Sequence, residues 1–147
     1  MENFYVLKIP RFGDERGRLT TLEVGREVPF EIKRTYYLSD VAEDKNRACH
    51  AHKISKRVLS VICGSCDVSL YDGNNKKEIV LDNPERGIYF NSGVWCELSN
   101  FKKGTVVLAL ASEPYFEEEY IRNFEDYIKY IKDKKHYESN DDSRHTT

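Results

Sequence analysis

Two histidines separated by one residue, His50 and His52, are the side chains of this sequence best suited to proton chemistry. Imidazole exchanges a proton near neutral pH and also binds divalent metals. On a β-strand, side chains two residues apart point to the same face. The run 58–63 is apolar and β-branched and stops at Gly64, which predicts a strand closed by a turn. The pair is either a functional site or two polar side chains on an exposed strand, and the flanking residues favour a site.

The spacing around the pair resembles the first motif of the cupin barrels, in which His-x-His precedes an acidic residue and then a glycine. Here Arg57 stands at the acidic position. Segment 87–96 resembles the second motif, and Cys96 stands where metal-binding cupins supply a further histidine. A guanidinium cannot ligate a metal ion and repels it. We therefore expect a pocket without a metal, and the alternative is a three-ligand zinc site formed by Cys96 and the two histidines.

Short alternating or apolar stretches separated by turns predict the elements that would hold these residues. Turns every eight to twelve residues or so are typical of an all-β barrel or sandwich, and a jelly-roll barrel leaves a pocket inside. The expected strands are 4–9, 19–24, 31–38, the strand that carries His50 and His52, 58–63, 66–71, 79–81, 87–90, 94–98 and 105–111. Within 31–38, Arg34 and Tyr36 share one face. They either line an anion-binding interior or lie exposed on an edge strand.

The pattern changes near Pro114, after which apolar residues recur close to every 3.6 positions. This periodicity predicts a helix over about 114–135, and two helices with a break near Arg122 and Asn123 are the alternative. Residues 136–147 are polar and are expected to form a disordered tail. We therefore expect a single domain over 1–135 that includes the C-terminal helix.

Length and composition exclude several classes of protein. The chain has 147 residues, as expected of one domain, and its net charge of -2 argues against a general nucleic-acid-binding surface. No stretch approaches the roughly 20 apolar residues of a membrane span. Residues 1–10 lack the basic start and apolar run of a secretory segment. We expect a cytoplasmic protein with reduced thiols.

Several segments together resemble one family, the nucleotide-sugar 3,4-ketoisomerases of dTDP-deoxysugar biosynthesis, which are small cupins. The matching segments are 14–19, 29–37, 50–53, 64–66, 72–73, 93–95, 110–115 and 119–123. The sequence departs from this family at three positions beside the expected pocket. Ala48 stands where relatives commonly have glycine, Arg57 where they commonly have glutamine, and Cys96 where they often have histidine or arginine. These departures bear on the substrate and the product stereochemistry more than on the fold.

The resemblance implies an isomerase that moves the keto group of dTDP-4-keto-6-deoxyglucose from C4 to C3 through an enediol. It implies a role in deoxyaminosugar biosynthesis for surface glycans such as lipopolysaccharide, no cofactor, and a homodimer joined through the N-terminal strands. The implied catalytic residues are His50, as principal acid and base, with Tyr36 and His52. The candidates for substrate binding are Arg16, Arg34, Arg47, Lys53, Arg57, Trp95, Cys96 and Glu97.

Some of these residues have a purely structural alternative. Lys53 lies on the opposite face of a regular strand from His52 and would then be exposed. Arg57 could pair with Glu97, and Trp95 could belong to the core. The alternative functions are another nucleotide-sugar isomerase or epimerase on the same barrel, and a sugar-binding cupin without catalysis. A metal-dependent cupin oxygenase is disfavoured by Arg57.

Overall fold

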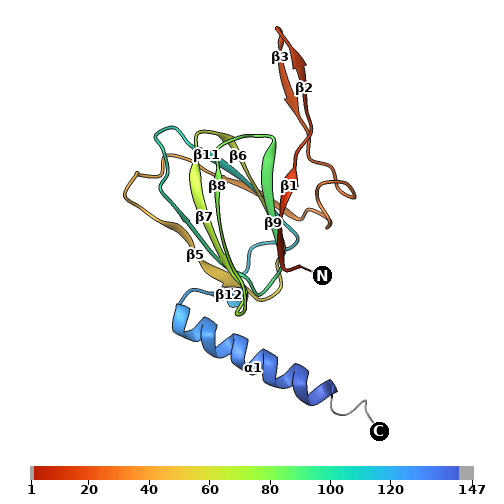
Figure 1. Cartoon of the computed structure of the whole chain (residues 1–147), viewed down its shortest axis with the longest axis vertical. Helices are drawn as coiled ribbons and strands as arrows, with labels where there is room; N and C mark the ends of the chain where they lie inside the picture. Colours follow the sequence, from red (N-terminus) through yellow and green to blue (C-terminus); the bar gives the residue numbers. More distant parts are fainter. Residues whose placement is uncertain (1, 143–147) are drawn as a thin grey trace.

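Two five-stranded antiparallel sheets pack face to face and enclose the core in this computed structural model, which describes residues 2–142 (Figure 1). One sheet has the order β1-β9-β6-β11-β4 and the other β12-β5-β10-β7-β8. A separate hairpin pairs β2 with β3. The strands are β1 (Phe4–Lys8), β2 (Arg11–Asp14), β3 (Gly17–Thr20), β4 (Arg34–Leu38), β5 (Arg47–His52), β6 (Arg57–Cys63), β7 (Cys66–Tyr71), β8 (Lys76–Leu81), β9 (Arg86–Phe90), β10 (Trp95–Ser99), β11 (Val106–Ala111) and β12 (Tyr120–Ile121), and the helices are η1 (Glu117–Glu119) and α1 (Phe124–Asp142). The predicted all-β jelly-roll class is confirmed.

The middle strands of the first sheet are buried on both faces, which explains their continuous apolar sequence. On β6, Leu59 and Val61 point into the core between the sheets. Val58 points the other way and packs against Ile9 and Phe30 from the N-terminal segment. The segment before β4 therefore covers the outside of the sheet, and the interior is left for the side chains of the facing strands.

Strand β5 contains a bulge immediately before the histidines. Cys96 on β10 lies opposite His50, but two residues further along β10 Leu98 lies opposite Arg47, so β5 carries one extra residue. Ala48 falls inside this bulge with a φ of 61°, in the left-handed region that favours glycine. The bulge sets which side of β5 faces inward at His50.

The helical prediction for 114–135 is wrong at both ends. Residues 117–119 form a 3-10 turn, β12 follows, and α1 begins only at Phe124. The apolar residues at 120 and 121 fit the strand because β12 pairs with β5, with Tyr120 opposite His52. The helix then continues to Asp142, so residues 136–142 belong to α1 rather than to the predicted tail. Residues 143–147 lie outside the described part of the chain.

Helix α1 packs against the barrel through a buried cluster that includes Tyr127 and Ile131 of the helix and Trp95 of β10. The Tyr127 hydroxyl lies 2.9 Å from the carbonyl of Tyr71 and 2.7 Å from that of Gly93. The helix lies at the end of the barrel opposite the β2–β3 hairpin (Figure 1). Within residues 2–142, no helix has the length and apolar character that a membrane crossing requires.

The β2–β3 hairpin projects away from the barrel (Figure 1). Its two large apolar side chains, Phe12 and Leu19, lie opposite each other and are 61% and 63% exposed. Isolated exposed apolar residues are common, but two on one projecting arm form a surface that water solvates poorly.

Candidate active site

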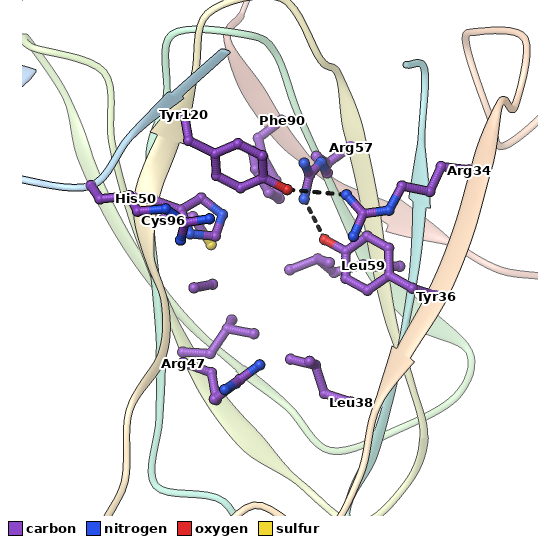
Figure 2. Close-up of a pocket in the computed structure, with 14 residues that line it drawn as sticks. Arg34, Tyr36, Leu38, Arg47, His50, Arg57, Leu59, Phe90, Cys96 and Tyr120 are labelled. Carbon is purple, nitrogen blue, oxygen red and sulfur yellow. Dashed lines mark hydrogen bonds between the residues drawn. The ribbon is translucent and has the colours of Figure 1, made fainter. Parts of the chain in front are cut away.

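A cavity of about 230 Å³ lies inside the barrel between the two sheets (Figure 2). Its apolar wall comes from core strands, and its polar wall comes from β4, β5, β6 and the segment around β12. The lining residues are Arg34, Tyr36, Leu38, Arg47, Ala48, His50, Arg57, Leu59, Phe90, Cys96, Leu98, Ala109, Tyr120 and Arg122. The lining thus contains one imidazole, two phenols and four guanidinium groups.

The two histidines share a face of β5 but have different environments. His50 lines the cavity and is half-buried, whereas His52 is 3% exposed and lies behind it. The two rings meet edge to face with centroids 4.7 Å apart. The Tyr120 ring contacts both, at 5.0 Å from His50 and 4.2 Å from His52. His50 is therefore the imidazole that a molecule in the cavity would meet.

Arg57 extends from β6 to two of the three catalytic candidates, Tyr36 and His52. Its Nη1 donates a hydrogen bond to the Tyr36 hydroxyl (Figure 2), and its Nη2 lies 2.9 Å from Nδ1 of His52. The expected alternative, an ion pair between Arg57 and Glu97, is wrong. Glu97 instead accepts a hydrogen bond of 3.0 Å from the indole N–H of Trp95.

Burial and nearby cations keep both imidazoles neutral at physiological pH. Burial, followed by the charge of Arg57, lowers the pKa of His50 to about 4 and that of His52 to about 2. Burial raises the pKa of Tyr36, although the charges of Arg57 and Arg34 oppose this shift. Burial also raises the pKa of the Cys96 thiol far above its ordinary value. The cavity therefore presents a neutral imidazole, a neutral phenol and a neutral thiol.

Sequence reasoning missed Tyr120 and Arg122, which form one wall of the cavity. The Tyr120 hydroxyl accepts a hydrogen bond of 3.0 Å from Nη1 of Arg34 (Figure 2), and the Arg122 guanidinium lies 4.3 Å from the centre of the Tyr120 ring. Arg122 also forms an ion pair with Glu117 at 2.7 Å. Segment 119–123 is one of those that resemble the ketoisomerase family, but its apolar spacing also fits a helix, and a helix was the structure predicted there.

Buried Glu119 fixes this wall to the turn after the histidines. One carboxylate oxygen accepts from the backbone N–H groups of Ile54 and Ser55, and the other accepts from the Ser55 hydroxyl at 2.8 Å. The same carboxylate lies 3.6 Å from Nδ1 of His52. Glu119 thus holds β12 beside β5, and with it the ring of Tyr120.

Several predicted binding residues lie outside this cavity. Trp95 and Glu97 flank Cys96 on β10, so strand alternation turns them to the opposite face of the sheet. There the Trp95 ring packs against Phe124 and Tyr127 of α1, with centroids 5.2 Å and 5.4 Å away. Their expected place in the pocket is therefore wrong.

Lys53 and Arg16 are also absent from the lining of the cavity. Lys53 is exposed at the end of β5. Arg16 lies at the tip of the projecting hairpin, where it pairs with Asp14 at 2.7 Å. Of the predicted basic residues, Arg34, Arg47 and Arg57 do line the cavity.

The geometry does not support the three-ligand zinc alternative. Across residues 2–142, no group of three or more His, Cys, Asp or Glu side chains is arranged to hold a metal ion. Nδ1 of His52 already faces a guanidinium, which disfavours a cation at that position.

Comparisons with known proteins agree with this architecture. The model of the family described as "FdtA: WxcM-like, C-terminal" matches residues 2–132. The TDP-4-oxo-6-deoxy-alpha-D-glucose-3,4-oxoisomerase of Aneurinibacillus thermoaerophilus is 42% identical over 131 residues, which cover 89% of this chain and 94% of that protein.

Two solved structures resemble the chain over most of its length. A 3,4-ketoisomerase from Helicobacter canadensis has a TM-score of 0.85 and 39% identity, covering 90% of this chain and 99% of that one. The sugar 3,4-ketoisomerase QdtA from Thermoanaerobacterium thermosaccharolyticum, solved in complex with TDP, also has a TM-score of 0.85 and 39% identity, with coverage of 90% and 96%.

Proposed function

The chain belongs to the FdtA family (WxcM-like, C-terminal), and from that membership we propose that it is a sugar 3,4-ketoisomerase acting on TDP-4-keto-6-deoxyglucose. The observation that carries the proposal is the neutral imidazole of His50 in a cavity lined by phenols and guanidinium groups. Moving a keto group from C4 to C3 requires only proton transfers, and imidazole is well matched to them.

His50 is the proposed acid and base. Its neutral ring removes the proton from C3 of the sugar, which gives an enediolate with its negative charge on O4. The proton of the C3 hydroxyl then moves from O3 to O4, and the imidazolium delivers its proton to C4, which leaves the keto group at C3. A pKa near 4 makes the free imidazole a weak base but its conjugate acid a ready donor. The negative diphosphate of the substrate would oppose the surrounding guanidinium charges and raise the pKa of His50 toward neutrality.

Tyr36 is the proposed partner of the sugar oxygens. Burial keeps its phenol protonated, so it can donate a hydrogen bond to an oxygen on which negative charge develops. Arg34, Arg47 and Arg122 are the proposed contacts of the diphosphate, because a planar guanidinium binds two phosphate oxygens at once. His52 supports His50 from behind rather than meeting the substrate.

We also propose a homodimer formed through the β2–β3 hairpin. The projecting arm exposes Phe12 and Leu19, and a second copy would cover them. Arg16 lies on the same arm, so its proposed contact with substrate would be made in the partner's pocket. Sedimentation analysis tests the dimer, because the double variant Phe12→Ser, Leu19→Ser should sediment as a monomer while the native chain sediments as a dimer.

A cytoplasmic location and a place in glycan biosynthesis stay predictions. The four free cysteines support the first, because the cytoplasm keeps thiols reduced. A product with a keto group at C3 supports the second, since a 3-keto sugar is the substrate that amination at C3 requires.

Incubation with TDP-4-keto-6-deoxyglucose in D₂O, followed by proton NMR, tests the proposed function. We expect a 3-keto product that carries solvent deuterium on the ring. Retention of the 4-keto group with inversion at another carbon would identify an epimerase on the same barrel. Binding in calorimetry without any deuterium exchange would identify a sugar-binding protein without catalysis.

A further inference from the structure

Arg57 is a buried cation without a carboxylate partner. It is 3% exposed, and no ion pair joins it to an acidic residue in the described part of the chain. Burial of an unpaired charge is costly, so such groups are uncommon unless they have a function. The partners of its terminal nitrogens are instead two neutral groups, the Tyr36 hydroxyl and Nδ1 of His52.

The contact with His52 determines which ring nitrogen carries the proton. Arginine can only donate, so Nδ1 of His52 accepts and the proton of the neutral ring lies on Nε2. The competing acceptor, Glu119, lies 3.6 Å from Nδ1, beyond hydrogen-bond distance. Its nearer oxygen already accepts from two backbone N–H groups. Nδ1 of His52 is therefore unable to act as a base.

The contact with Tyr36 determines the direction of the phenol proton. Because Arg57 donates to the phenol oxygen, the hydroxyl proton of Tyr36 stays free to donate elsewhere. Tyr120 is held in the same way by Arg34 (Figure 2). Both phenols of the cavity thus accept from an arginine and keep their own protons available.

We propose that Arg57 is a positioning residue that divides the proton chemistry between its two neighbours, holding His52 as the Nε2–H tautomer and leaving the Tyr36 proton for the substrate. This inference rests on the proposed function and extends it. It reassigns Arg57 from a substrate contact to a residue that acts through Tyr36 and His52, and it leaves His50 as the imidazole that moves protons.

The charge of Arg57 acts on both histidines, so its role can be tested separately from the roles of its neighbours. The titratable and charged groups that face the pair are Arg34, Tyr36, Arg47, Arg57, Cys96, Glu117, Glu119, Tyr120 and Arg122. After burial, Arg57 is the largest cause that lowers the pKa of His50 and of His52. Removal of its charge should therefore raise both pKa values.

Nitrogen-15 NMR of the histidine rings, without substrate, tests the proposal independently of turnover. The variants are Arg57→Gln and Arg57→Lys, and Lys56→Gln is the control because Lys56 is exposed and next in sequence. The native His52 should be a neutral Nε2–H tautomer from pH 7 down to pH 5 or so. In Arg57→Gln its tautomers should mix and its pKa should rise, while Lys56→Gln stays native. A native Nδ1–H tautomer, or no change in Arg57→Gln, would overturn the proposal.

The pH dependence of turnover provides the second readout. In Arg57→Gln we expect kcat to fall about tenfold and the acid limb of kcat/KM to move up by about one pH unit. Arg57→Lys should keep the native limb because it keeps the charge. A higher KM with native kcat would instead make Arg57 a substrate contact and reject the proposal.

The proposed function and the proposed role of Arg57 can fail independently of each other. If the native protein does not turn over TDP-4-keto-6-deoxyglucose, the proposed function fails, yet the ring NMR still decides the role of Arg57. Glutamine is common at this position in the family that the sequence resembles, so Arg57→Gln is compatible with the fold, and circular dichroism checks this.

Discussion

His50 on β5 lies directly opposite Cys96 on β10, and this is the last aligned pair before an extra residue enters β5. The extra residue displaces the strand just before the catalytic candidate. Ala48 lies at this point with its backbone in the left-handed region, at a φ of 61°. The position of His50 therefore depends on a backbone conformation that alanine adopts only at a cost.

Ala48→Gly should stabilise the protein. The left-handed conformation costs alanine about 1–2 kcal/mol, and the greater freedom of glycine in the unfolded chain returns about half of this. We expect the free energy of unfolding in urea to rise by about 0.5–1 kcal/mol. Ala109→Gly, in the buried strand β11, is the control and should lower it by about 1 kcal/mol. Equal losses in the two variants would contradict a strained Ala48.

His50→Asn should abolish turnover and leave the fold intact. The amide keeps the polarity of the site but cannot carry a proton between C3 and C4, so the loss should be at least about 10²-fold. The melting temperature should change by only a few degrees or so, because His50 is half-buried and lines the cavity rather than the apolar core. His136→Asn, on the exposed part of α1, is the matched control and should retain full activity. Native turnover in His50→Asn would remove His50 from the mechanism.

The pH profiles of kcat/KM and kcat should have acid limbs at different pH. Only the neutral imidazole of His50 accepts a proton, so kcat/KM should rise with pH through about 4, the pKa in the free protein. The bound diphosphate favours the protonated ring, so the limb of kcat should lie at higher pH. Coincident limbs would argue against the proposed placement of the diphosphate near His50.

The free energy of unfolding limits how low in pH the kcat and kcat/KM profiles can be measured. The folded pKa values of His50 and His52 are lowered, so between their folded values and the ordinary 6.5 the unfolded chain binds more protons. The free energy of unfolding should therefore fall as pH drops below about 6.5. Circular dichroism at each pH separates loss of the fold from protonation of the base.

Removal of metal ions should leave turnover unchanged. A divalent ion beside Nδ1 of His52 would meet the guanidinium of Arg57, which repels it. We expect native kcat after dialysis against a chelator and no gain when Zn²⁺ is added back. A loss of activity that one added metal restores would contradict this reading of the site.

Glu119→Gln should destabilise the protein more than Ser55→Ala. The neutral amide can still accept from the backbone N–H groups of Ile54 and Ser55 through its oxygen, but it loses the carboxylate charge that strengthens these hydrogen bonds, whereas Ser55→Ala removes one neutral donor. We expect losses of about 2–4 kcal/mol and about 1 kcal/mol in urea unfolding. Glu118→Gln, at an exposed neighbouring position, should lie close to native. A native value for Glu119→Gln would show that the wall is held by other contacts.

Strand periodicity predicted the barrel and the inward face of β5, because alternation is a local property of the backbone. The same rule explains one error, since Cys96 and its neighbours Trp95 and Glu97 cannot share a face of one strand. Tyr120 was missed for a different reason. Its spacing to Phe124 and Tyr127 fits a helix, and only the pairing of β12 with β5 selects a strand.

The hydrogen-bond partners of Arg57 also could not be predicted from the residues next to it in the sequence. The sequence shows a cation in place of an acid, but its two acceptors, Tyr36 and His52, come from two different strands. Only the packing of β4, β5 and β6 brings the three together.

The cavity wall formed by Tyr120 and Arg122 is synthesised after the strands that carry the other lining residues. Ribosomes synthesise the chain from its N-terminus, so β5 with both histidines emerges long before β12 can pair with it. A nascent chain can assemble most of its strands around a cavity that is still open on one side. Only a chain synthesised past β12 can close this cavity, so we expect activity to begin after that point in synthesis.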